Sequence, residues 1–196
     1  KEWNLTSDLP PVGSNLGFEG ITWVPDAYLT GAAFKDASTG AAYAPTRYGA
    51  HSGGVFFTGV EGTGMIYGYV LEDSGAFTRV ASFSSGMSGV MELQWEPGAA
   101  RLWAVCDDTC KGQHRTFQVA STGTFTPKAV YNRPSGMPDY NNEGFAWQAP
   151  TSASPDRSPS TGPTTATTTA THCARAASPA DVRPHRSSPP PRCGPS

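Results

Sequence analysis

Three glutamates recur in this sequence, each with a tryptophan three or four residues further on. The recurring pairs are Glu19 with Trp23, Glu92 with Trp95 and Glu143 with Trp147. If these segments are repeats arranged around an axis, their carboxylates form a ring. Such a ring binds a hard cation such as Ca²⁺ through oxygen ligands, or repulsion raises the pKa of some of its members. Alternatively, each carboxylate accepts backbone N–H bonds where its unit begins.

The elements that must position these glutamates are short strands in a repeat of about 50 residues. The segment Val70 to Phe83 resembles Gln118 to Tyr131: each contains a strand, a Ser/Thr-Gly turn, a Phe-Thr pair and a second strand. The Gly- and Ala-rich segment Thr30 to Gly54 is the expected insertion in the first repeat. The clearest strands are predicted at residues 65–71, 77–83, 90–95, 101–107 and 114–120.

This period is typical of a β-propeller blade, so the predicted fold is all-β, a partial β-propeller of about three blades of antiparallel meander. A β-sandwich is the alternative, because its strands are equally short and evenly spaced. Propellers need about 4 to 8 blades. We therefore expect part of a propeller, truncated at the N-terminus, whose open edges favour self-association.

The composition changes after Pro150. Residues 1–150 hold all five Trp, nine Phe and seven Tyr, and residues 151–196 hold none. A segment of this kind buries too little apolar area to fold, so residues 151–196 are predicted to be a disordered Ser/Thr/Pro/Ala tail. A second interpretation is that the tail is a frameshifted translation of the true C-terminus of the 1–150 domain. Cys173 and Cys193 lie in this tail and are assigned no partner.

The segment CDDTC places Cys106 and Cys110 at a spacing that closes a small disulfide loop in an exported chain. Such a loop displays Asp107 and Asp108 at a strand end. The two aspartates are either part of a cation site or substrate-facing pair at the rim, or a solvated surface loop. A zinc site is not expected, because no second ligand pair has finger-like spacing.

Other motifs indicate less specific chemistry. The segment HSGG at His51 resembles an oxyanion-hole turn, but the G-x-S-x-G motif of an α/β-hydrolase is absent, and His51 is predicted to be a loop residue. Lys111, His114 and Arg115 either attract a phosphate or balance the neighbouring aspartates. The net charge of −2 gives no broad basic face for nucleic acid. No apolar run approaches the roughly 18 residues of a membrane span.

Three segments carry a family resemblance: GFEGITW, VMELQWEPGAARLWAVCDD and YNNEGFAW. They resemble the family called esterase-like activity of phytase, which consists of secreted bacterial phytase-like β-propellers, and the resemblance covers about residues 15 to 147. It implies secretion and a small-molecule phosphate or carboxyl ester as the substrate. In such a hydrolase a metal, Ca²⁺ being the expected ion, polarises the ester and activates water. The ligands or general bases would be Glu19, Glu92, Glu143, Asp107 and Asp108. The alternative is a non-catalytic propeller that binds a ligand or a protein.

Overall fold

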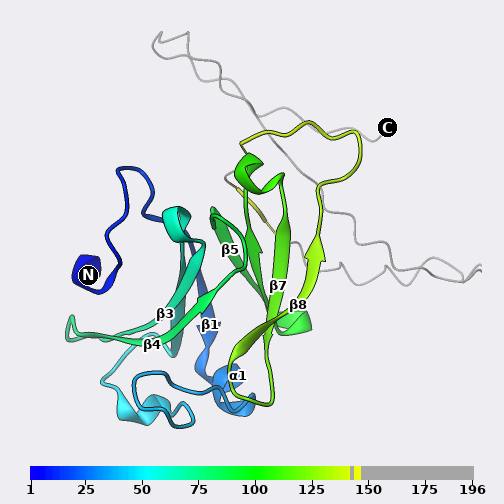
Figure 1. The fold of residues 1–196 in the computed structure, drawn as a ribbon. Coiled ribbons are helices and arrows are strands. Elements are labelled where there is room, and N and C mark those ends of the chain that lie inside the picture. Colours follow the sequence, from blue (N-terminus) through cyan, green and yellow to red (C-terminus); the bar gives the residue numbers. More distant parts are fainter. Residues whose placement is uncertain (142–143, 147–196) are drawn as a thin grey trace, which may run out of the picture.

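The chain folds into two four-stranded antiparallel sheets that stand side by side (Figure 1). The computed structural model describes residues 1–141 and 144–146. Sheet 1 consists of β1 (Phe18–Pro25), β2 (Gly54–Val60), β3 (Met65–Leu71) and β4 (Phe77–Ser84). Sheet 2 consists of β5 (Glu92–Glu96), β6 (Arg101–Val105), β7 (His114–Val119) and β8 (Phe125–Tyr131). In both sheets the spatial order of the strands is their order along the chain, so each is a meander.

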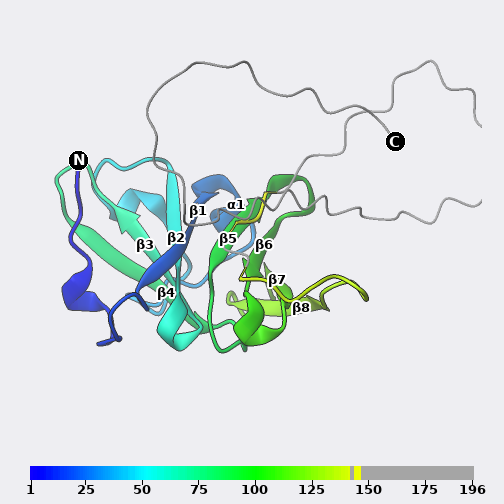
Figure 2. The ribbon, with the colours of Figure 1, turned by 90° about the horizontal axis from the view of Figure 1, so that it is seen from above.

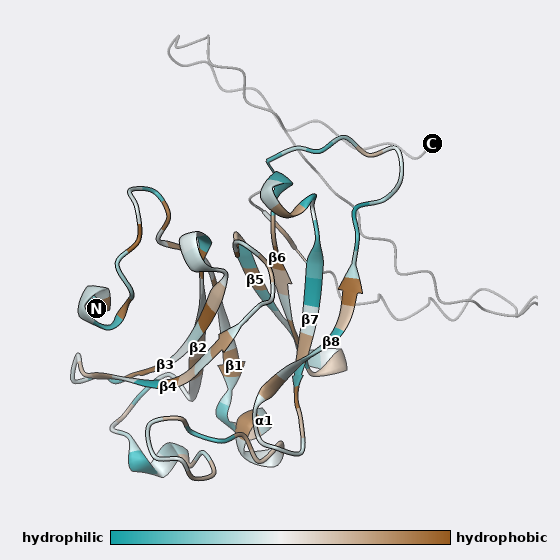
Figure 3. Cartoon of the chain, in the orientation of Figure 1, coloured by the Kyte–Doolittle hydropathy of each residue, from teal (hydrophilic) through white to brown (hydrophobic). Residues whose placement is uncertain are grey.

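The main hydrophobic core lies between the two sheets. Val24, Phe57 and Val80 of sheet 1 belong to one buried cluster with Leu102 and Phe117 of sheet 2. Aromatic rings join the halves of this core, since the ring centroids of Phe83 of sheet 1 and Phe125 of sheet 2 lie 5.5 Å apart and stacked. The hydropathy colouring shows brown segments along β1, β2 and β6 (Figure 3). Burial of these β-branched and aromatic side chains is the main force that holds the sheets together.

The two sheets repeat one another in detail. The β3–β4 hairpin turns at Gly75 and the β7–β8 hairpin turns at Gly123, and both glycines have positive φ angles. In the β3–β4 ladder Val80 has no pairing partner, and in the β7–β8 ladder Lys128 has none, so each hairpin carries a bulge at the same place. The internal repeat predicted from residues 70–83 and 118–131 is therefore confirmed as a structural repeat.

The first strands of the two sheets, β1 and β5, run side by side in the same direction (Figure 2). A Cβ atom on Gly20 would lie 2.6 Å from the backbone nitrogen of Leu93, so the two backbones are in direct contact there. Two residues further on, the Thr22 hydroxyl accepts a hydrogen bond of 2.9 Å from the Trp95 amide. Only a glycine at position 20 permits this approach.

A long connection between β1 and β2 matches the predicted insertion. It begins with α1 (Asp26–Gly31) and contains a 3₁₀ turn at Pro45–Arg47. Leu29, Phe34 and Tyr43 of this connection are buried in the main core. The remaining 3₁₀ turns lie at Thr6–Asp8, Glu61–Thr63, Pro97–Ala99 and Asp108–Cys110.

The predicted strands at residues 65–71, 77–83, 90–95, 101–107 and 114–120 all correspond to observed strands, with shifts of at most two residues at their ends. The all-β class and the antiparallel meander are confirmed, and within the described residues the two sheets do not close into a ring. Glu143, Trp147 and the predicted tail at 151–196 lie outside the described residues. In the described part of the chain, no helix has the length and hydropathy of a membrane span.

Candidate functional site

Four of the predicted site residues lie at the same end of the two sheets. Glu19 and Glu92 stand at the starts of the parallel strands β1 and β5, and Asp107 and Asp108 follow the end of β6. Because β6 is antiparallel to β5, with Glu92 opposite Val105, the end of β6 lies beside the start of β5. We call this end of the molecule the carboxylate end. The fifth predicted residue, Glu143, is not among the described residues.

The structure explains why Glu19 and Trp23 are one residue further apart than Glu92 and Trp95. The β1–β2 pairing contains a bulge between Phe18 and Ile21, whereas the β5–β6 pairing is regular. The bulge takes up the extra residue. As a result Glu19 and Glu92 occupy equivalent positions at the starts of their strands despite the different spacing.

The two glutamates have different surroundings. Glu19 is exposed, whereas Glu92 is partly buried where β5 meets β1. Burial raises the pKa of the Glu92 carboxyl, and a hydrogen bond of 2.8 Å from the Leu93 amide to Oε1 opposes this rise only in part. A carboxyl group with a raised pKa retains its proton closer to neutral pH, which suits a general acid.

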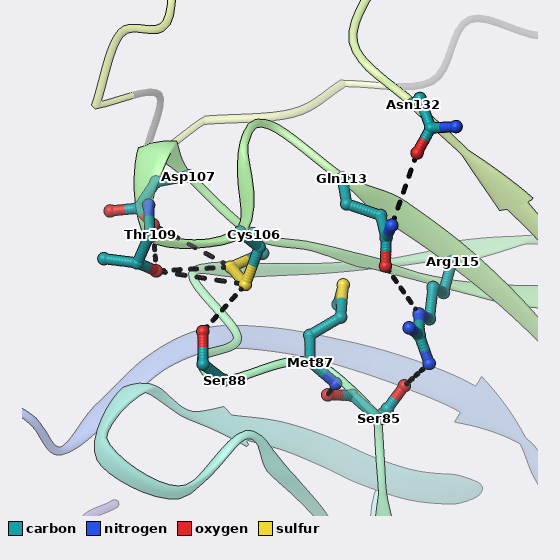
Figure 4. Close-up of a disulfide and its surroundings, with 10 residues drawn as sticks. Ser85, Met87, Ser88, Cys106, Asp107, Thr109, Gln113, Arg115 and Asn132 are labelled. Atoms are coloured by element: carbon teal, nitrogen blue, oxygen red, sulfur yellow. Dashed lines mark hydrogen bonds between the residues drawn. A yellow bond between two sulfur atoms is a disulfide. The ribbon is translucent and has the colours of Figure 1, made fainter.

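The CDDTC segment forms the predicted disulfide between Cys106 and Cys110. Asp107 is 5% exposed, and its Oδ1 accepts hydrogen bonds from the Thr109 amide (3.0 Å) and the Thr109 hydroxyl (2.7 Å). These bonds cap the short 3₁₀ turn at Asp108–Cys110. Figure 4 shows this loop against Ser88, whose hydroxyl lies 3.1 Å from the Cys110 sulfur. One oxygen of Asp107 is thus already used by its own loop, while Asp108 faces solvent.

The carboxylate end offers oxygen ligands but no complete metal cluster within the described residues. No group of three or more His, Cys, Asp or Glu side chains converges in residues 1–141 and 144–146. Of the predicted ligands, Asp107 has one oxygen bonded to Thr109, and Glu92 accepts a bond from the Leu93 amide. A Ca²⁺ site there would need a further ligand such as Glu143, and the calcium assignment stays a prediction.

The three basic residues predicted to cluster beside CDDTC have different surroundings in the structure. Arg115 donates to the Ser85 carbonyl (3.1 Å) and the Gln113 side chain (2.9 Å), which holds the β4–β5 loop in place (Figure 4). The His114 ring packs edge-on against Phe145, with centroids 5.4 Å apart. Lys111 lines an open hollow of about 270 Å³ together with Arg133 and residues 132–137. Of the three residues in the predicted cluster, Lys111 is the one that lines a surface hollow, where it could attract an anion.

A polar cluster that sequence reasoning missed lies at the opposite end, in the connection between β1 and β2. We call this the insertion end. The Asp26 carboxylate accepts a bond of 2.7 Å from the Tyr43 hydroxyl and lies 3.0 Å from the His51 ring Nε2. The other His51 ring nitrogen, Nδ1, lies 2.8 Å from the Gly49 carbonyl. Both ring nitrogens of His51 therefore face oxygen atoms.

Asp36 is the second centre of the insertion end. Its side chain is fully buried and accepts bonds from the Ser38 amide (2.9 Å), the Ser38 hydroxyl (2.7 Å) and the Tyr48 hydroxyl. Burial, together with the bond to Asp36, raises the pKa of Tyr48 to about 12. His51 was predicted to be a loop residue, and it does lie in this connection. Its partner Asp26 is far away in sequence, and no motif or period joins them.

No protein-family model, curated protein or solved structure was found to match this chain.

Proposed function

We propose that the two sheets are neighbouring blades of a phytase-like β-propeller and that its carboxylate end hydrolyses a phosphate or carboxyl ester. The observation that carries this proposal is the parallel contact of β1 with β5 at Gly20 and Leu93. Innermost strands of adjacent blades run in parallel around a common axis, so this contact brings repeated side chains to one end of that axis. The repeated side chain here is a glutamate.

Glu92 is the proposed acid. Hydrolysis adds one water across the ester: the water oxygen bonds to phosphorus or to the carbonyl carbon, and the leaving oxygen receives a proton. Glu92, whose pKa is raised by burial, would donate that proton and recover one from the attacking water. Glu19, exposed at the equivalent position, would orient the water.

The disulfide supports the proposal of secretion. Disulfides persist in oxidising compartments and are rare in reducing ones. Cys106 is buried and Cys110 lies beside Ser88, so the bridge fixes the loop that carries Asp107 and Asp108. An extracellular protein acting on small-molecule esters is consistent with this rigid acidic loop.

The test is hydrolysis of p-nitrophenyl phosphate and p-nitrophenyl acetate by the full chain, with and without EDTA. We expect Glu92→Gln to lower turnover about 100-fold, while Glu2→Gln, at an exposed position near the N-terminus, leaves it unchanged. Loss of turnover with EDTA would support the Ca²⁺ prediction. Equal rates in Glu92→Gln and the unmodified chain would contradict the proposed role of Glu92.

The second candidate function is a non-catalytic propeller that binds a ligand or a protein. It is favoured by the surface of the carboxylate end, where the hollow beside Glu61, Ser88 and Met91 is open and only about 200 Å³. Substrate pockets are usually deeper and more enclosed. Absence of turnover with both esters, together with binding detected by calorimetry, would favour this function over hydrolysis.

A further inference from the structure

Strand β1 presents an apolar strip on the side that faces away from sheet 2. Ile21 is 59% exposed, Trp23 is 39% exposed and Phe18 is 37% exposed. Phe18 pairs with Val60 and Ile21 pairs with Thr58, two residues apart on β2, so the bulge keeps all three side chains on one side of the sheet. Three adjacent large apolar side chains on one strand form a patch that usually marks an interaction site.

The equivalent residues of sheet 2 show what covers such a strip. Leu93 and Trp95 hold the places in β5 that Ile21 and Trp23 hold in β1, yet they are only 1% and 6% exposed. They are buried in one cluster with Val24 and Phe57 of sheet 1, and the ring of Tyr28, in α1, lies 4.6 Å from the Trp95 ring. In this repeat the strip is therefore covered by the neighbouring four-stranded sheet together with the short helix that follows its first strand.

The rest of this side of sheet 1 is already covered by the chain itself. Leu5, Leu9 and Val12 of the N-terminal segment pack against a buried cluster of Val60, Tyr67 and Tyr69. Figure 1 shows this segment, in dark blue, on the side of β3 and β4 that is away from sheet 2. Ile21 and Trp23 stay exposed, so the open strip lies on the innermost strand, β1. The other side of β1 is the one that contacts β5.

The far side of sheet 2 offers the complementary surface. Trp103 is buried there between the stacked ring of Tyr131, at 4.9 Å, and the ring of Phe145, at 5.5 Å. Tyr131 is itself 38% exposed. The two open sides therefore lie at opposite ends of the two-sheet stack, as the two partners of a repeated stacking contact must.

We propose that the strip formed by Phe18, Ile21 and Trp23 binds the Tyr131 side of sheet 2 in a second copy of this chain. The association is head-to-tail, and at the innermost strand it repeats between copies the contact that sheet 2 makes with sheet 1 within one copy. A contact of this kind uses two different surfaces and leaves one of each open at the ends of the assembly. It involves neither an ester nor a cation, and so it stands apart from the proposed hydrolysis.

The test is sedimentation equilibrium of the full chain over a concentration series. The unmodified 20.6 kDa chain should show an average mass that rises with concentration. Ile21→Lys blocks the strip and Tyr131→Lys blocks the complementary surface, so each variant alone should stay monomeric. Val130→Lys, a 50% exposed neighbour on the opposite side of β8, is the matched control and should associate like the unmodified chain. Circular dichroism checks that every variant is folded.

A mixture of the two blocked variants gives the decisive result. Each retains one intact surface, so Ile21→Lys and Tyr131→Lys together should form a one-to-one dimer that does not grow further. A mixture that stays monomeric would overturn the proposal, as would an unmodified chain that is monomeric at every concentration. Association of Ile21→Lys alone would also overturn it, because the contact would then lie elsewhere.

Discussion

Asp26 and Asp36 at the insertion end have different surroundings from Glu92 at the carboxylate end. At the insertion end, Asp36 is fully buried and receives three hydrogen bonds from Ser38 and Tyr48, and Asp26 is held between Tyr43 and His51. At the carboxylate end, Glu92 accepts a hydrogen bond from the adjacent Leu93 amide, and its pKa is raised by burial.

This difference distinguishes carboxylates that stabilise the fold from carboxylates that are free to bind a ligand or a proton. A buried carboxylate surrounded by donors stabilises the fold and has little capacity left for a ligand. A partly buried carboxylate with few donors is in a less favourable state as an anion, which a proton or a ligand relieves. On this physical ground the carboxylate end is the functional candidate, although the insertion end contains the histidine.

The largest expected effect is at Asp36. Asp36→Ala removes the buried acceptor of the Tyr48 hydroxyl and of two Ser38 groups. We expect the free energy of unfolding to fall by about 4 kcal/mol, because hydrogen bonds to a charged group contribute about 1.5–3 kcal/mol each. Urea denaturation measures this loss. The matched control is Asp73→Ala, whose side chain is 66% exposed, and it should change stability by less than about 0.5 kcal/mol. Equal losses in the two variants would contradict a structural role for Asp36.

Gly20→Ala should have the next largest effect, because it disrupts the contact between β1 and β5 at the carboxylate end. The new methyl group would lie 2.6 Å from backbone atoms of Glu92 and Leu93, so β1 and β5 must separate. We expect a loss of about 3 kcal/mol, at the upper end of overpacking costs. Gly17→Ala meets no atom within 4 Å and serves as the control. An unchanged melting temperature in Gly20→Ala would show that the two strands are not in contact.

The smallest effect is the pH dependence that Glu92 contributes. Its folded pKa lies above the ordinary value of 4.5, so the folded state binds the proton more tightly than the unfolded state. The contribution to the free energy of unfolding is therefore fully present below pH 4.5 and is lost as pH rises through the raised folded pKa. Glu92→Gln should remove this downward slope, and Glu2→Gln should keep it. The measurement is the free energy of unfolding from denaturation curves between pH 4 and pH 8. Equal slopes against pH for the unmodified chain, Glu92→Gln and Glu2→Gln would contradict the account.

The sequence predicts the strands well, because alternating apolar residues and Gly turns are local signals. Gly75 and Gly123, with the matching segments around them, predict both hairpins and their repetition. The disulfide follows from the spacing of Cys106 and Cys110. The carboxylate end is also predictable in outline, because the glutamates repeat with the strands that carry them.

Other features depend on contacts between distant residues and have no local signal. The pairing of Asp26 with His51 joins two ends of an irregular connection, and Tyr43, which is buried in the core, donates its hydroxyl to the same carboxylate. The spacing of Glu19 and Trp23 gives no sign of the bulge between Phe18 and Ile21, which appears only in the pairing of β1 with β2. Asp107 is in a motif that predicts a ligand, and the motif does not show that Thr109 occupies one of its two carboxylate oxygens.

The central claim is that β1 and β5 run side by side and so bring the repeated glutamates to one end. A nuclear Overhauser spectrum of the ¹⁵N-labelled chain tests it most directly. The account predicts a strong cross-peak between an α-proton of Gly20 and the amide proton of Leu93, whose nitrogen lies 2.6 Å from the place of a Gly20 Cβ. A spectrum with both residues assigned and no such cross-peak would contradict the claim.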